Sequence, residues 1–356
     1  MTFDVADFRR YMESSQNTAH IDGVLAEVRG QMDTSNFLYP LKNLPTLDER
    51  TIIYTDTDGN STLLFNEGSS ESEGIEAIFV VQGVLWDFTL PPILAKTDLP
   101  RRVQFAKQSV VIHGWGNKHF VEDRQAIEAI HQKMSANYKE GTLKPWDGLN
   151  TTDSDMTSKE YSNRYFTPIQ HANGELSIPF GSNVDPYQHL SRAATSNMVH
   201  LSTNEVGYYQ YIPIHRRKTG FVCFNPAQFR AGQLVQIQIA FKTVPSGGKT
   251  IQHRLICQLK SIAMLDNAMQ QTYESIVRAR NEHQKAGRGI AIKRPIGYLQ
   301  FSPAGEMSTK KVRTEEHIER VDESMAESKE GESGAEGRFR NGSLNIDGLS
   351  LNDDIA

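Results

Sequence analysis

The segment at residues 229–266, FRAGQLVQIQIAFKTVPSGGKTIQHRLICQLKSIAMLD, constrains the fold more than any other part of the chain. From Val235 to Phe241 every second residue is large and apolar, and the residues between are polar or small. This period of two predicts a strand with one buried face and one hydrated face. A glycine turn at 247–248 reverses the chain into a second such run, and Asp266 or Asn267 can then cap a helix. The segment therefore predicts a long β-hairpin that leads directly into a helix.

Other parts of the chain predict a mixture of helices and antiparallel strands. Apolar residues recur at helical spacing within residues 1–30, which predicts two short helices. Residues 51–65 predict a second hairpin, residues 75–90 and 103–114 predict strands, and Asp123 is a candidate cap for a further helix. We therefore predict an α+β fold with a predominantly antiparallel β core and peripheral helices. The core is a barrel or a sandwich, with an OB-like barrel as one candidate.

Composition divides the chain into three parts. The N-terminal helices occupy residues 1–30, and a β-rich core occupies residues 31–300. A stretch rich in Gly, Pro, Asp and Thr at 141–158 is a candidate internal boundary within the core. Residues 305–356 hold 13 Asp or Glu against 7 Lys or Arg and almost no aromatic residues. Such a segment buries too little apolar surface to offset its ordering entropy, so residues 301–356 are predicted to be a disordered acidic tail that could bind a protein partner.

Composition also bears on the cellular setting. The chain begins with MTFDVADFRR, which lacks the apolar run of a secretory signal, and no stretch reaches the ~18 apolar residues of a membrane span. Its only cysteines are Cys223 and Cys257, too few for a disulfide framework, and both are expected to be small buried hydrophobic residues. The sequence therefore predicts an intracellular protein, cytoplasmic or nuclear, with no membrane partner.

The sequence carries no convincing catalytic motif. It has no G-x-S-x-G, H-E-x-x-H or C-x-x-C pattern. The SGGKT run at 246–250 resembles the end of a phosphate loop, but Thr243 stands where that motif needs glycine, and a hairpin turn explains the run better. His113 and His119, with Glu122 nearby, offer metal-binding side chains without a recurring zinc spacing. No cofactor and no catalytic residue are predicted, and a metal-dependent enzyme at His113 and His119 is the third hypothesis.

The strongest chemical signal is the aromatic and basic stretch at residues 208–224, YYQYIPIHRRKTGFVCF. Proteins that bind single-stranded nucleic acid stack bases on aromatic rings and follow the backbone with cations. The alternative is that the rings are core residues and the cations form a solvated hairpin tip. A second basic run follows at 278–294 and has the same two interpretations. The predicted nucleic-acid-binding residues are Tyr208, Tyr209, Tyr211, Phe224, Arg216, Arg217 and Lys218, with Trp86 and Trp115 as further stacking platforms.

Five blocks of the chain resemble a known group of sequences. They are LPTLDE at 44–49, GVLWDFTLP at 83–91, VVIHGWG at 110–116, NRYFTP at 163–168 and the hairpin at 229–266. Together they span most of residues 1–300 and resemble an uncharacterised multi-copy protein family of mushroom-forming (basidiomycete) fungi. That family has no established activity, so the resemblance assigns no site residue. The number of copies implies an association with mobile elements.

A second resemblance concerns the hairpin alone. A strand that ends with Leu259, Ile262 and Leu265 after a glycine turn is similar to the closing hairpin of some OB barrels in single-strand DNA-binding proteins. Those proteins often carry a disordered acidic tail. This chain ends in NDDIA and lacks the terminal aromatic residue that is common in such tails.

These observations rank three functions. The leading hypothesis is a non-enzymatic module that binds single-stranded nucleic acid. The alternative is a protein–protein interaction module or a self-assembling structural β domain, because the hairpin is amphipathic and the tail suits partner capture. The metal-dependent enzyme is third.

Overall fold

The computed structural model describes most of the chain up to residue 287, all within the compact unit Met1–Ile290. Arg216, Arg217, Lys218, residues 147–158 and the predicted tail at 301–356 lie outside the described residues. The described ranges are 5–31, 38–40, 47–57, 59–66, 74–115, 117–146, 159–172, 174–213, 220–246 and 252–287.

The predicted N-terminal helices are confirmed, and they pack into the core instead of standing apart from it. Phe8, Met12 and Leu25 are at most 1% exposed and share an apolar cluster with Val84 and Leu234 of the sheet. The helices are α1 (Val5–Met12), α2 (Ser15–Gln31), α3 (Leu47–Arg50), α4 (Lys118–Ser135), α5 (His189–Ala193) and α6 (Ala268–Gly287).

Both predicted hairpins are present, as β2–β3 and β11–β12, and the second leads into α6 as expected. The Asp266 carboxylate caps α6 by accepting the Ala268 N–H at 3.0 Å. The strands are β1 (Leu38–Pro40), β2 (Thr51–Thr55), β3 (Ser61–Phe65), β4 (Ile78–Thr89), β5 (Lys107–His113), β6 (Lys159–Arg164), β7 (Thr167–Pro168), β8 (Met198–Val199), β9 (Gly207–Tyr211), β10 (Phe221–Cys223), β11 (Leu234–Ser246) and β12 (Gln252–Asp266).

The main sheet is large and mostly antiparallel, as predicted, so the fold belongs to the α+β class. Within the described strands, the parallel pairings are β1–β4, β6–β12 and β9–β12. Strand β4 pairs with β5, β5 with β6, β6 with β12, β12 with β11, and β11 again with β4. These five strands therefore form a continuous ring of pairings. Strands β1, β2, β3, β9 and β10 extend from it, and β7 pairs with β8 in a separate two-stranded sheet.

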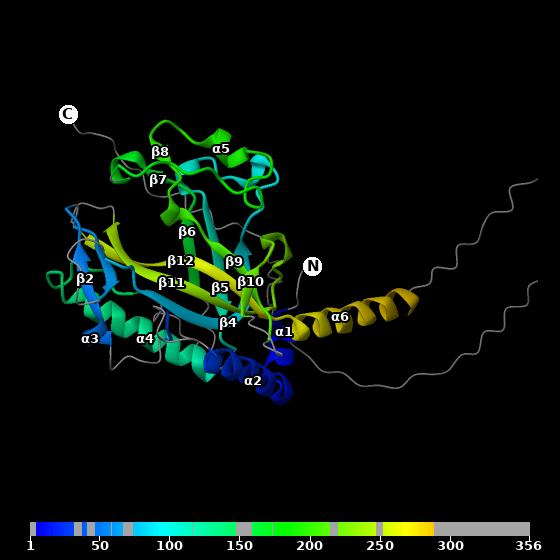
Figure 1. Cartoon of the computed structure of the whole chain (residues 1–356). Helices are drawn as coiled ribbons and strands as arrows, with labels where there is room; N and C mark the ends of the chain where they lie inside the picture. Colours follow the sequence, from blue (N-terminus) through cyan, green and yellow to red (C-terminus); the bar gives the residue numbers. More distant parts are fainter. Residues whose placement is uncertain are drawn as a thin grey trace, which may run out of the picture. The chain divides into compact units, whose positions relative to one another are not determined.

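Three apolar clusters hold the fold together. The largest lies among β4, β5, β11, β12 and α4, and α4 runs alongside the sheet in Figure 1. The second joins α1, α2 and α6 to the ends of β4 and β11. The third includes residues of the long segment between β6 and β9. The elements of that segment, β7, β8 and α5, group together away from α4 in Figure 1. Ile93, Tyr165 and Leu190 are in this third cluster and are at most 4% exposed.

Three local expectations were wrong. Asp123 does not cap a helix: α4 begins a turn earlier, where the Asn117 side chain accepts the His119 and Phe120 N–H groups, and Asp123 is only 1% exposed. The polar face of β11 is not fully hydrated, because Gln236 is 3% exposed and its Oε1 accepts a 2.7 Å hydrogen bond from Gln82. Of the two cysteines expected to be buried, Cys223 is exposed on β10 and only Cys257 is buried.

Candidate nucleic-acid interface

The tyrosines of β9 do not offer the predicted stacking surface. Tyr208 is 6% exposed and its hydroxyl donates to Oε1 of Gln108, while burial raises the pKa of Tyr208 well above its ordinary value. Tyr211 is 8% exposed and donates to Glu27 at 3.3 Å. The reason is topological: β9 lies parallel to β12, so its rings point into the two larger cores.

The remaining aromatic residues of that prediction are only partly accessible. Tyr209 is half-buried, and Phe224 is half-buried with its ring edge-on to Phe229 at 5.2 Å. Arg216, Arg217 and Lys218 lie outside the described residues. Tyr208 and Tyr211 are therefore core residues, as the alternative interpretation expected of the rings, whereas Phe221 of the same stretch is 41% exposed.

The two reserve tryptophans are also core residues. Trp115 is 5% exposed and stacks on His113 with ring centroids 4.2 Å apart. Trp86 is half-buried and meets the Trp115 ring at 5.5 Å in an edge-on arrangement. Phe8 of α1 closes over both rings, at 5.9 Å from each. The glycine-flanked loop thus turns Trp115 inward, where the N-terminal helix covers it.

The histidine pair does not form a metal centre with its neighbours. His113 and His119 are 4% and 7% exposed, and Nδ1 of His119 lies 3.2 Å from Glu122. Across the described ranges, no three His, Cys, Asp or Glu side chains gather in a group that could hold a metal ion. The structure provides no geometric support for the metal-dependent hypothesis.

A different cluster combines an exposed ring with unneutralised cations. Phe105 is 44% exposed, and the guanidinium of Arg164 lies over its ring, with Cζ 5.7 Å from the ring centroid. Arg254 is also exposed, and its charge acts on Arg164. In the part of the chain that the structure describes, neither arginine forms an ion pair. We call Phe105, Lys107, Arg164 and Arg254 the arginine–phenylalanine cluster.

Strand register brings Lys107 and Arg164 of this cluster together. Lys107, the first residue of β5, pairs directly with Arg164, the last residue of β6, so their side chains lie on the same face. Phe105 ends a short 3₁₀ turn, Val103–Phe105, just before β5, and the Tyr165 N–H donates to the Ala106 carbonyl at 3.0 Å. Arg254 comes from the start of β12, immediately after the β11–β12 turn.

The electrostatics of the cluster favour an anionic ligand. Partial burial of the guanidinium lowers the pKa of Arg164 below its ordinary value, and repulsion from Arg254 lowers it further. The arginine remains charged at neutral pH because its ordinary pKa is near 12.5. Glu160 forms a 2.7 Å ion pair with Lys107 and neutralises only that member. An anion between the two arginines would relieve their repulsion.

Sequence reasoning missed this cluster because its members are far apart along the chain. The motif LPRR at 99–102 and the RYF run at 164–166 gave no combined signal. The sequence signal that was available is Phe105, an apolar residue near the start of the predicted strand and just after the basic LPRR motif.

Comparisons with known proteins give no relative from which a site could be transferred. No protein-family model, no curated protein and no solved structure matches this chain. The candidate interface therefore depends on its own geometry and chemistry.

Proposed function

We propose that this protein binds single-stranded nucleic acid without catalysing a reaction, and that the arginine–phenylalanine cluster is the contact surface. The exposed ring of Phe105 offers a face for a base, and Arg164 and Arg254 offer charges for the phosphate backbone. Single-strand binders need these two kinds of group on one β surface. The Arg164 guanidinium over the exposed Phe105 ring, with the Arg254 charge acting on that guanidinium, is the observation that carries the proposal.

The strand arrangement supports an OB-like barrel as the scaffold. The ring β4–β5–β6–β12–β11 has five strands, and the last strand in the chain inserts between the third and the fourth, as in a Greek-key barrel. OB barrels bind oligonucleotides on the face of their second and third strands and on the loops that join strands 1–2 and 4–5. The cluster occupies the equivalent places: β5 and β6, the loop before β5, and the residues after the β11–β12 turn.

The test is a binding titration of the full chain with labelled single-stranded DNA and RNA 20-mers at several salt concentrations. Each phosphate neutralised on a single strand contributes a log–log salt slope of about −0.7. The double variant Arg164→Ala/Arg254→Ala should therefore flatten the slope by about 1.4. Phe105→Ala should weaken binding by about 5- to 150-fold, because a stacked base is worth about 1–3 kcal/mol.

Matched controls come from the same molecule. Phe221 on β10 is 41% exposed, an exposed fraction similar to the 44% of Phe105. It belongs to the stretch at 208–224. Arg10 on α1 has a 76% exposed side chain. Phe221→Ala and Arg10→Ala should leave binding unchanged. Affinity no tighter than about 100 μM at low salt equals background nonspecific binding and refutes the proposal. A defined oligomer in light scattering, with no response to nucleic acid, would favour the self-assembly alternative instead.

A further inference from the structure

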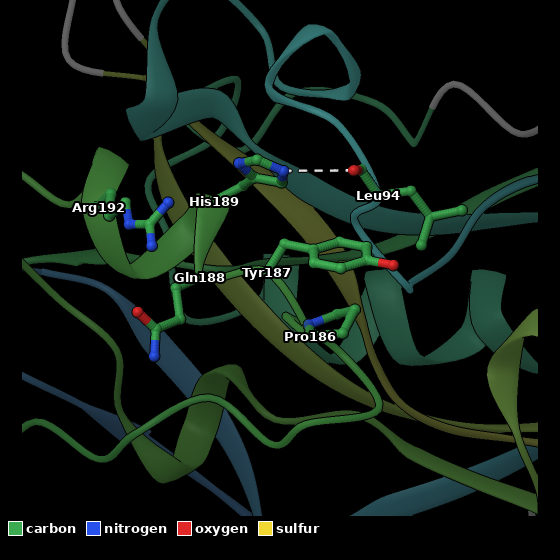
Figure 2. A pocket seen from close by; sticks show the side chains of 6 residues that line it. All are labelled: Leu94, Pro186, Tyr187, Gln188, His189 and Arg192. Carbon is green, nitrogen blue, oxygen red and sulfur yellow. Dashed lines mark hydrogen bonds between the residues drawn. The ribbon is translucent and has the colours of Figure 1, made fainter.

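A second surface site lies between the β4–β5 loop and the segment that leads into α5. A pocket of about 610 Å³ is present here, and Figure 2 shows Leu94 on one side of it and the run from Pro186 to His189 together with Arg192 on the other. No carboxylate lines this pocket. Its polar groups are a phenol, an amide, an imidazole and a guanidinium.

The pocket walls are fixed from behind. The Ile93 N–H donates to the Val184 carbonyl at 2.9 Å, and Nε2 of His189 lies 3.2 Å from the Leu94 carbonyl (Figure 2). That carbonyl can only accept, so His189 donates from Nε2 and turns its other nitrogen away from Leu94. Leu190, next in the chain, is fully buried in the third apolar cluster. The two walls are therefore held in place before any ligand arrives.

The backbone carries strain at the pocket. Gln188 adopts φ 59° and ψ 31°, the left-handed region that favours glycine. For a residue with a side chain this conformation is strained and persists only where the surroundings enforce it. The enforcement is visible: the Asp185 carboxylate accepts the Leu190 and Ser191 N–H groups at 3.1 and 2.9 Å. Strain held in this way positions the neighbouring Tyr187 and His189 at the surface.

The accessible groups suit a ligand that is both flat and anionic. Tyr187 is 59% exposed, and its ring lies 6.1 Å from that of His189 at 52°, so a face of the phenol is open to solvent. Arg192 is exposed and its N–H donates to the Gln188 carbonyl at 3.0 Å, whereas its guanidinium has no ion-pair or hydrogen-bond partner within the described ranges. In Figure 2, Arg192 and Leu94 lie on opposite sides of the Tyr187–His189 pair. A ring on Tyr187 and a negative group at Arg192 can be bound together.

We infer that this pocket binds a nucleotide unit, with the base stacked on Tyr187 and the phosphate at Arg192. As a subsite for a strand bound at the arginine–phenylalanine cluster, it depends on the proposed function; as a site for a free mononucleotide, it does not. The β4–β5 loop joins the two places, because Leu94 and Phe105 lie near its two ends and Ile93 and Ala106 share the third apolar cluster.

The first experiment measures binding of AMP to the full chain by calorimetry, beside adenosine, ribose 5-phosphate and inorganic phosphate. AMP should bind, and Tyr187→Ala and Arg192→Ala should each weaken it at least fivefold. The matched controls are Tyr54→Ala, because Tyr54 is 56% exposed on β2, and Arg10→Ala; both should bind AMP as the wild type does. Phe105→Ala should also bind AMP normally, which separates this site from the cluster.

Four results would overturn the inference. The first is that AMP does not bind. The second and third are that Tyr187→Ala or Arg192→Ala leaves the affinity for AMP unchanged. The fourth is that inorganic phosphate or ribose 5-phosphate binds as tightly as AMP. A competition experiment then identifies the source of the nucleotide. Displacement of AMP by a short 5′-phosphorylated oligonucleotide assigns the pocket to a strand, and displacement by free mononucleotides alone assigns it to a small molecule. AMP binding without oligonucleotide binding would reject the proposed function and retain this site.

Discussion

The buried ion pair between Arg29 and Asp123 should make the stability of this protein fall as pH rises. Nη2 of Arg29 on α2 lies 3.0 Å from Oδ2 of Asp123 on α4, and Nε of Arg29 donates to Gln82 at 2.6 Å. Asp123 is 1% exposed, and its Oδ1 has no hydrogen-bond partner in the described structure. Burial raises the pKa of Asp123 from 3.8 to about 7, although the Arg29 charge acts to lower it.

The sign and the size of the effect follow from proton linkage. Between pH 3.8 and 7 the folded protein holds a proton on Asp123 that the unfolded chain has lost, so the free energy of unfolding decreases as pH rises. The stabilisation is complete below pH 3.8 and is lost as pH passes 7. Integration of the two titrations from pH 5 to pH 8 gives a loss of about 2.6 kcal/mol.

The assay is urea denaturation of the wild type and of Asp123→Asn at pH 5, 6, 7 and 8. The asparagine keeps the shape and can still accept from Arg29, but it does not titrate. The wild type should lose about 2.6 kcal/mol relative to the variant over this range, with little further change above pH 8. Asp48→Asn, whose side chain is 87% exposed in the wild type, should show no such pH-dependent difference. The assignment is refuted if the stability difference between the wild type and Asp123→Asn stays constant, or shifts in favour of the wild type, as pH rises.

Two further substitutions test the structure around the candidate sites. Tyr208→Phe removes the buried hydroxyl that donates to Gln108. It should lower the free energy of unfolding by about 1–3 kcal/mol in urea denaturation and leave oligonucleotide affinity unchanged. A large loss of affinity would instead identify Tyr208 as a binding residue. Phe8→Ala removes a fully buried ring that packs on Trp86, Trp115 and Tyr273. It should lower the free energy of unfolding by about 3–5 kcal/mol in the same assay. A decrease below about 1 kcal/mol would mean that α1 is not part of the core.

Elements with a local cause could be predicted from the sequence. The period-two run that became β11 and the capping carboxylate of Asp266 each depend on residues only a few positions away, and both were predicted from the sequence. The helices within residues 1–30 were predicted from spacing for the same reason. Their destinations were not predictable: the helical stripe of α1 required an apolar partner but did not say that Trp86 and Trp115 would be that partner.

The stacking surface predicted from the sequence was wrong at Tyr208 and Tyr211, because residue type was used to infer solvent exposure. Tyr208 and Tyr211 carry the residue types of a stacking surface, but exposure depends on what β9 pairs with and what covers it. The same limitation applies to Asp123, whose carboxylate resembled a helix cap in the sequence and proved to be a buried partner of Arg29. In both cases a residue 50 or more positions away determines the environment.

The sequence by itself determined the class of the fold, because strand alternation, helical spacing, turns and caps are short-range properties of the chain. Only the tertiary structure decided which side chains meet. Phe105 and Arg164 are separated by 59 residues and meet through the pairing of β5 with β6, and the charge of Arg254, a further 90 residues along the chain, acts on Arg164. Leu94 and His189 meet in the same way across the pocket. Contacts of this kind depend on long-range packing energy, which no local pattern in the sequence encodes.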